Sequence, residues 1–114
     1  MNHLLKTAYF SGLIDGEGYI GMMSNGPGKK KYPSLQVKMT CKVTIKSLMD
    51  HFECGNIREV PPPKNKPHHK TQWKWYVSHK SCIKVIEEIS PFLVTKKNDA
   101  NIVYEHRFTK KGPQ

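Results

Sequence analysis

Two stretches of strict alternation between apolar and polar residues most constrain the fold. In residues 32–40, YPSLQVKMT, and in residues 71–78, TQWKWYVS, every second side chain is apolar. Successive side chains of a β-strand point to opposite faces, so each stretch predicts a strand with one buried and one polar face. Trp73 and Trp75 fall on the face predicted to be buried. The chain must therefore supply helices to cover one side of a sheet.

The remaining elements follow from the spacing of apolar residues and of turn residues. Helical spacing predicts helices over residues 3–14, 44–52, about 80–89 and about 95–107, and shorter apolar runs predict strands over 19–24 and 55–60. A Gly- and Pro-containing turn at 25–31 and a Pro-rich loop at 61–70 separate the strands. The order αββαββαα indicates an α+β fold with an antiparallel sheet in two strand pairs and helices on one face. We expect one domain over residues 1–114, with a core from about 3 to 107.

The charge balance indicates a polyanionic partner. Nineteen Lys and Arg residues against nine Asp and Glu residues give a net charge of +10, which favours nucleic acid first and an anionic membrane surface second. No apolar run approaches the roughly 20 residues of a membrane span. Cys41, Cys54 and Cys82 form no CxxC pair, and no common zinc spacing occurs. We expect an intracellular, reducing location, in a cytoplasm, a nucleoid or an organelle matrix.

The polar face of the predicted sheet carries side chains that can hydrogen bond to base edges, and basic loops flank it. An ordinary solvated sheet face is the alternative. On the nucleic-acid interpretation, the residues expected to contact double-stranded DNA are Met23, Asn25, Lys29, Lys30, Lys31, Tyr32, Ser34, Gln36, Lys38, Asn56, Arg58, Lys64, Lys66, Lys70, Gln72, Lys74, Tyr76 and Ser78.

The first predicted helix runs into an acidic corner, Asp15-Gly16-Glu17-Gly18. A helix C-terminus presents unpaired carbonyls and partial negative charge, so carboxylates there are electrostatically unfavourable. A divalent cation such as Mg²⁺, which prefers oxygen ligands, resolves the conflict. The alternative is that Asp15 only caps a turn while Glu17 is solvated.

Residues 10–18, FSGLIDGEG, closely resemble the signature of the LAGLIDADG homing endonucleases. The segments LQVKMTCK, FECGNIREV and WKWYVSHKSCIKVIEEISPFLVTKKNDANIVYE resemble later segments of that family in the same order, so the resemblance covers about residues 4–106. It implies an αββαββα fold whose saddle-shaped sheet lies on DNA. Because one motif is present, it also implies a homodimer through the motif helix, residues 3–15, on a near-palindromic site. Ser11 and Gly12 would allow the two helices to approach closely, while Leu13 and Ile14 enter the core.

The resemblance further implies an intron-encoded or free-standing Mg²⁺- or Mn²⁺-dependent DNA endonuclease, a mobile-element hydrolase of phosphodiester bonds. Glu17, Lys96 and Cys41 would be catalytic, Glu17 and the Gly16 carbonyl would hold the metal, and Gly12, Asp15 and Gly18 would be structural. Cys41 departs from the polar residue, often Gln, that many members carry there. The alternative is a catalytically weak or inactive nucleic-acid-binding protein of the same fold, either a maturase-like splicing cofactor with an intron RNA partner or a DNA-binding regulator.

Overall fold

Four antiparallel strands form one open sheet in the order β1-β2-β4-β3. They are β1 (Gly18–Ser24), β2 (Lys31–Met39), β3 (Asn56–Val60) and β4 (Gln72–Ser78). The computed structural model describes residues 2–109, with side chains to residue 106, so residues 1 and 110–114 of the expected domain lie outside the described part. Two hairpins, β1–β2 and β3–β4, join through the β2–β4 pair, which confirms the predicted two strand pairs.

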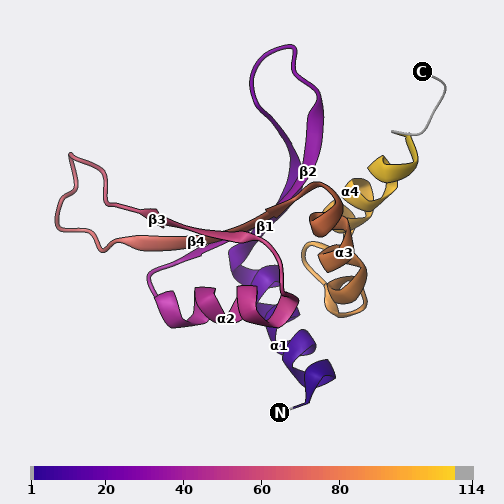
Figure 1. The fold of residues 1–114 in the computed structure, drawn as a ribbon, viewed down its shortest axis with the longest axis horizontal. Helices are drawn as coiled ribbons and strands as arrows, with labels where there is room; N and C mark the ends of the chain where they lie inside the picture. Colours follow the sequence, from indigo (N-terminus) through magenta and orange to yellow (C-terminus); the bar gives the residue numbers. More distant parts are fainter. Residues whose placement is uncertain (1, 110–114) are drawn as a thin grey trace.

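The helices lie together on one side of this sheet (Figure 1). They are α1 (His3–Glu17), α2 (Lys42–Phe52), α3 (His79–Ile89) and α4 (Lys97–Thr109), with a short 3₁₀ turn η1 (Ser90–Phe92) between the last two. The predicted order αββαββαα and the α+β class are confirmed. Within residues 2–109, no helix is long and apolar enough to cross a membrane.

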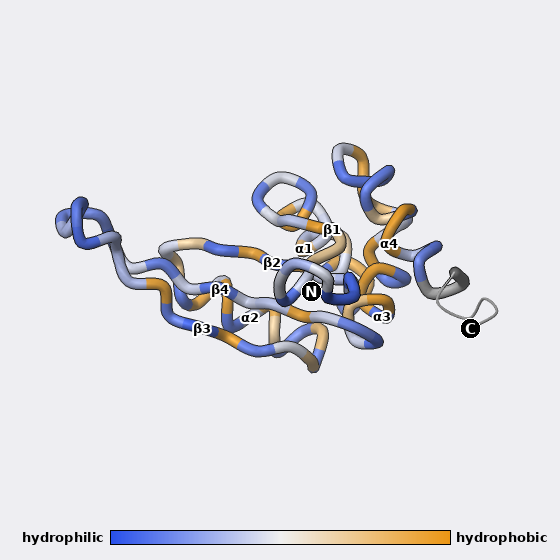
Figure 2. Tube along the Cα trace, turned by 90° about the horizontal axis from the view of Figure 1, so that it is seen from above, coloured by the Kyte–Doolittle hydropathy of each residue, from blue (hydrophilic) through white to orange (hydrophobic). Residues whose placement is uncertain are grey.

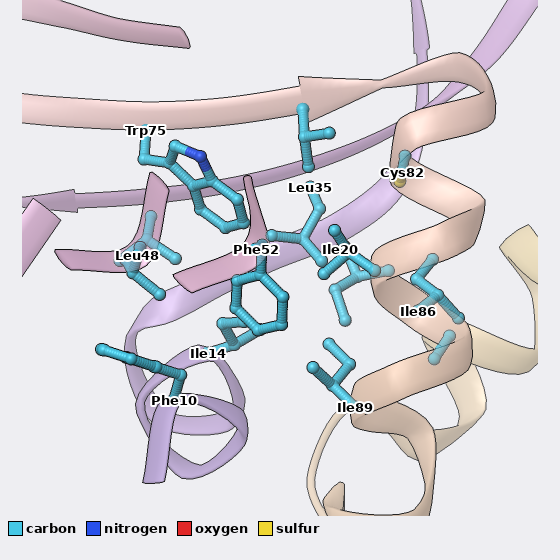
Figure 3. Packing of buried hydrophobic residues seen from close by; sticks show 14 of the residues in the cluster. Phe10, Ile14, Ile20, Leu35, Leu48, Phe52, Trp75, Cys82, Ile86 and Ile89 are labelled. Carbon is cyan, nitrogen blue, oxygen red and sulfur yellow. The ribbon is translucent and has the colours of Figure 1, made fainter. Parts of the chain in front are cut away.

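The core forms between the helices and the apolar face of the sheet, as the alternation predicts (Figure 3). Trp75 is fully buried, and its ring stacks on that of Phe52 with centroids 5.6 Å apart. The indole Nε1 of Trp75 donates a 3.0 Å hydrogen bond to the Cys54 carbonyl, so its one polar atom is satisfied. Each large apolar side chain buried here stabilises the fold by roughly 1.5–3 kcal/mol.

Helix α1 continues three residues beyond its predicted end, so the acidic corner is the last helical turn and not a loop. The helix ends where Gly18 turns into β1 and donates its N–H to the Ile14 carbonyl. A Cβ on Gly18 would lie 2.8 Å from that carbonyl oxygen, closer than real Cβ atoms approach. Glycine is therefore required where β1 leaves the helix, and Glu17 is held against the start of the sheet.

Candidate active site and nucleic-acid interface

The register of the sheet sorts the polar side chains into rows on the face that the helices leave open. Residues directly opposite each other across antiparallel strands share one face. Gln36 lies opposite both Tyr19 and Tyr76, and Tyr76 lies opposite Asn56, which makes a row of uncharged hydrogen-bonding groups. The polar face predicted from the alternation is confirmed by this register.

The neighbouring row contains three cations, and we call it the cation row: Lys38 lies opposite Lys74, which lies opposite Arg58. Like charges directly opposite destabilise a sheet, and no carboxylate forms an ion pair with these three side chains within the described residues. The ammonium of Lys74 lies 5.5 Å from the ring centroid of Tyr76. The cation row therefore concentrates positive charge, without an ion-pair partner among the described residues, on the face that the helices leave open.

Glu17 stands beside the cation row. A hollow of about 360 Å³ lies where the end of α1 meets the sheet face, and its lining residues are Glu17, Gly18, Tyr19, Gln36, Lys38, Arg58, Val60 and Lys74. The Glu17 side chain is exposed. The structure thus brings the predicted metal ligand together with predicted DNA-binding residues from β2, β3 and β4.

One predicted contact residue is largely covered by its neighbours. Ser34 is only 4 % exposed, and its hydroxyl accepts a hydrogen bond from Gln36 Nε2 at 3.3 Å. Alternation places a residue on a face but does not tell whether neighbours cover it, so a DNA contact by Ser34 stays a prediction. The remaining predicted contact residues on the strands, among them Gln72 and Ser78, are exposed or half-buried.

The outer end of the β1–β2 hairpin adds a residue that sequence reasoning missed. His79 stacks on Tyr32 with ring centroids 4.9 Å apart, and it adopts a left-handed backbone conformation with φ 56°. Met23 lies opposite Tyr32, and the Tyr32 hydroxyl donates to Asn25 Oδ1 at 3.5 Å. In the sequence, the feature that could have pointed to this contact of His79 is its position directly between the predicted strand and the predicted helix.

The basic loops lie at opposite ends of the sheet, as predicted. Lys29 and Lys30 are exposed in the turn between β1 and β2, and Lys31 is exposed at the first residue of β2. Lys64, Lys66 and Lys70 are exposed in the β3–β4 loop, which projects away from the body of the molecule and is hydrophilic along its length (Figure 2).

Asp15 makes a different contact from Glu17, although both are in the last turn of α1. Its carboxylate accepts hydrogen bonds from the backbone N–H groups of Val94 and Thr95 at 3.0 Å and of Lys96 at 2.7 Å. Desolvation alone would raise the pKa of Asp15, but these three amides and the Lys96 charge lower it from its ordinary value. Asp15 therefore fixes the segment that leads into α4 against the end of α1.

Lys96 supplies the cation that the last turn of α1 lacks. Its ammonium donates a 2.7 Å hydrogen bond to the Asp15 carbonyl, one of the carbonyls left unpaired at a helix C-terminus. The neighbouring Lys97 donates instead to the Ser90 carbonyl at 2.7 Å. This contact between segments far apart in the sequence thus offsets part of the negative charge at the C-terminus of α1.

Cys41 is exposed at the N-cap position of α2 and does not line the hollow beside Glu17. The Thr44 hydroxyl donates to its Sγ at 3.1 Å and thereby lowers the pKa of the thiol. Burial has the opposite effect on Cys82, whose pKa rises to about 12. Cys41 is thus the exposed thiol with a lowered pKa, but the structure does not bring it to the hollow that Glu17 lines.

The groups at the end of α1 fit a hard divalent cation, though incompletely. Glu17 offers a carboxylate, and because α1 ends at Glu17 no helical amide follows to pair with the Gly16 carbonyl. Within the described residues, however, no group of three or more His, Cys, Asp or Glu side chains converges. A metal ion held by Glu17 would need further oxygen ligands that are not His, Cys, Asp or Glu side chains of the described residues.

One face of α1 lacks a cover within the described chain. Leu4, Leu5 and Tyr9 are each more than half exposed, and a Cβ on Gly12 would meet nothing within 4 Å. Ser11 does not belong to this face: it is fully buried and its hydroxyl donates to the Thr7 carbonyl at 2.6 Å. Of the two small residues expected at the helix seam, Gly12 lies on this uncovered face and Ser11 does not, and the seam itself stays a prediction.

No protein-family model matches the sequence, and no curated protein is similar to it. Solved structures do match the fold. The homing endonuclease I-CvuI, in complex with its target in the presence of calcium, superimposes with a TM-score of 0.73 at 22 % identity, over 90 % of this chain and 66 % of I-CvuI. The archaeal intron-encoded homing endonuclease I-Vdi141I, complexed with DNA, has a TM-score of 0.75 at 16 % identity, over 96 % and 72 % of the two chains.

The LAGLIDADG meganuclease I-AabMI, bound to uncleaved DNA, matches with a TM-score of 0.68 at 18 % identity. The match covers 98 % of this chain but 38 % of I-AabMI, so the chain spans just under two thirds of I-CvuI and less than two fifths of I-AabMI. These similarities show that the chain has the fold of the LAGLIDADG homing endonucleases, and the resemblance noted in the sequence is confirmed at that level.

Proposed function

We propose that this chain, which has the LAGLIDADG homing endonuclease fold, is a site-specific endonuclease that cuts double-stranded DNA with Mg²⁺ or Mn²⁺. The observation that carries the proposal is the position of Glu17: an exposed carboxylate at the end of α1, in a hollow shared with Lys38, Lys74 and Arg58. A metal-binding acid beside a cationic, hydrogen-bonding sheet face is the arrangement that hydrolysis of a bound phosphodiester requires.

The residues have separate tasks in this proposal. The Glu17 carboxylate and the Gly16 carbonyl hold the metal, which when bound supplies a Lewis acid that stabilises charge on the reacting phosphate. The sheet face and the loop lysines hold the duplex. Asp15, through its three backbone hydrogen bonds, keeps Lys96 at the end of α1, where its ammonium is available to a nearby phosphate if it leaves the Asp15 carbonyl.

The active assembly is proposed to be a homodimer. Among the described residues that line the hollow, Glu17 is the only carboxylate, and the uncovered face of α1 leads directly to it. Pairing two α1 helices through Gly12 would bring two Glu17 side chains together and would match a near-palindromic DNA site.

The test is a cleavage selection on a randomised duplex library. Wild type in Mg²⁺ should cut near-palindromic sites, whereas Glu17→Gln in Mg²⁺ and wild type in Ca²⁺ should bind the same sites uncut. We expect Glu17→Gln to lose more activity than the roughly 10–100-fold that removal of a group behind a metal ligand costs. Binding without cutting by wild type in Mg²⁺ would refute the endonuclease proposal.

One observation favours a second candidate, a nucleic-acid-binding protein of the same fold that does not cut, such as a splicing cofactor for intron RNA or a DNA-binding regulator. Lys96 is hydrogen bonded within the chain, and Cys41 does not reach the hollow, so only one of three predicted catalytic groups is free at the site. Parallel selections on duplex DNA and on structured RNA, both without cleavage, distinguish this candidate from the first.

A further inference from the structure

The cation row has a property that general DNA binding does not require. Lys38, Lys74 and Arg58 lie within β2, β4 and β3, and β2 and β4 are the inner strands of the sheet. The loop lysines, in contrast, lie at the ends of the hairpins. Side chains at the middle of a sheet that enters the major groove face the base edges, whereas the flanking loops meet the phosphates.

We infer that the cation row reads guanine, so that each half of the DNA site contains a run of up to three neighbouring base pairs in which guanine faces Lys38, Lys74 and Arg58. This inference rests on the proposed function, because it requires the sheet face to lie on duplex DNA. It goes beyond that function by assigning bases to named residues.

The chemistry of the three side chains selects guanine among the four bases. Lysine and arginine carry hydrogen-bond donors and no acceptors. In the major groove, guanine presents two adjacent acceptors, O6 and N7, whereas cytosine presents a donor, adenine one acceptor beside a donor, and thymine one acceptor beside a methyl group. Guanine therefore matches donor-only side chains best. A row of three such side chains favours a run of neighbouring guanines in the DNA site.

The dimensions allow the row to reach three neighbouring base pairs. Neighbouring strands lie about 4.8 Å apart, so a row across three strands spans about 9.6 Å. Three neighbouring base pairs are separated by two steps of about 3.4 Å and span about 6.8 Å, so they fit within the length of the row. The uncharged row beside it, with Gln36 and Asn56, has amides that pair with adenine instead, so the guanine preference is confined to the cation row.

The experiment is a binding selection from a randomised duplex library in Ca²⁺, in which the readout is base preference and not cutting. Wild type should enrich guanine about 5- to 150-fold over other bases at two or three neighbouring positions in each half-site. Lys38→Gln, Lys74→Gln and Arg58→Gln should each move one of these positions from guanine toward adenine, because glutamine pairs with the adenine edge.

Lys64→Gln is the matched control, since it removes the same charge from an exposed loop position. It should make the slope of the logarithm of the binding constant against the logarithm of the salt concentration shallower by about one, without changing the selected bases. Circular dichroism establishes that all four variants are folded.

Three outcomes decide the inference. A guanine run that changes only in the cation-row variants supports it. A selected site without a guanine run, or cation-row variants that behave like Lys64→Gln, overturns it while the DNA-binding function stands, and assigns the row to phosphates. Failure of wild type to select any duplex refutes the proposed function and this inference with it.

Discussion

At the scale of single residues, two acidic side chains that are separated in sequence by one glycine have different surroundings. Asp15 accepts three backbone hydrogen bonds from residues 94–96, whereas Glu17 is exposed in the hollow beside the cation row. We expect Asp15→Ala to lower the free energy of unfolding by about 0.5–2 kcal/mol, the range for losing a side chain that caps backbone amides. Urea unfolding measures this free energy.

The control is Asp50→Ala, at an exposed carboxylate with no hydrogen bond or ion pair within the described chain. It should change the free energy of unfolding by less than about 0.5 kcal/mol.

The same contact predicts a pH dependence. The pKa of Asp15 is lowered on folding, so its contribution is complete above the unfolded-state pKa of about 3.9 and is lost as the pH falls through the folded-state pKa. The stability difference between wild type and Asp15→Ala should therefore narrow from pH 6 to pH 3. A difference that stays constant over this range would show that charge on Asp15 is not what holds residues 94–96.

At the scale of secondary structure, the cation row costs the sheet stability. Lys74 on β4 lies between Lys38 on β2 and Arg58 on β3, so it faces a like charge on both sides. We expect Lys74→Gln to raise the free energy of unfolding of the DNA-free chain by about 0.2–1 kcal/mol while it weakens DNA binding. Urea unfolding and a binding titration on the same preparation measure the two effects.

Lys64→Gln again serves as the control, because Lys64 lies in the exposed β3–β4 loop and should change stability by less than about 0.5 kcal/mol. A Lys74→Gln variant less stable than wild type would mean that the lysine packs usefully on Tyr76 and that its place in the row is structural.

At the scale of the whole molecule, the uncovered face of α1 predicts a dimer of twice the 13.1 kDa chain. A Cβ on Gly12 meets nothing within 4 Å among the described residues, so Gly12→Leu should leave the monomer folded and should stabilise its helix by up to about 1 kcal/mol. It should nevertheless abolish the dimer, because the added side chain separates the two helices. Sedimentation velocity measures the mass, and Lys46→Leu, at an exposed position of α2, is the matched control. A Gly12→Leu variant with the mass of wild type would contradict pairing through this face.

Much of the fold follows from local patterns. The alternation in β2 and β4 placed Leu35, Val37, Trp75 and Val77 in the core before any contact was known, because a strand has a period of two. The same period assigned the open face and so identified most of the proposed nucleic-acid interface. The acidic corner pointed to Glu17 because two carboxylates at a helix C-terminus oppose the helix dipole.

Tertiary contacts decided the rest, because they join residues far apart in the chain. The two-residue period of a strand determines the face of the sheet on which a lysine lies. The alignment of Lys38, Lys74 and Arg58 in one row depends on the register of three strands. The 79–81 residues that separate Asp15 from the amides it binds carry no local signal of that contact. Periodicity along the chain thus determined which residues lie on the open face of the sheet, because a strand has a period of two. Packing between distant segments determined which of them lie together and which side chains, like those of Ser34 and Lys96, already make contacts within the fold.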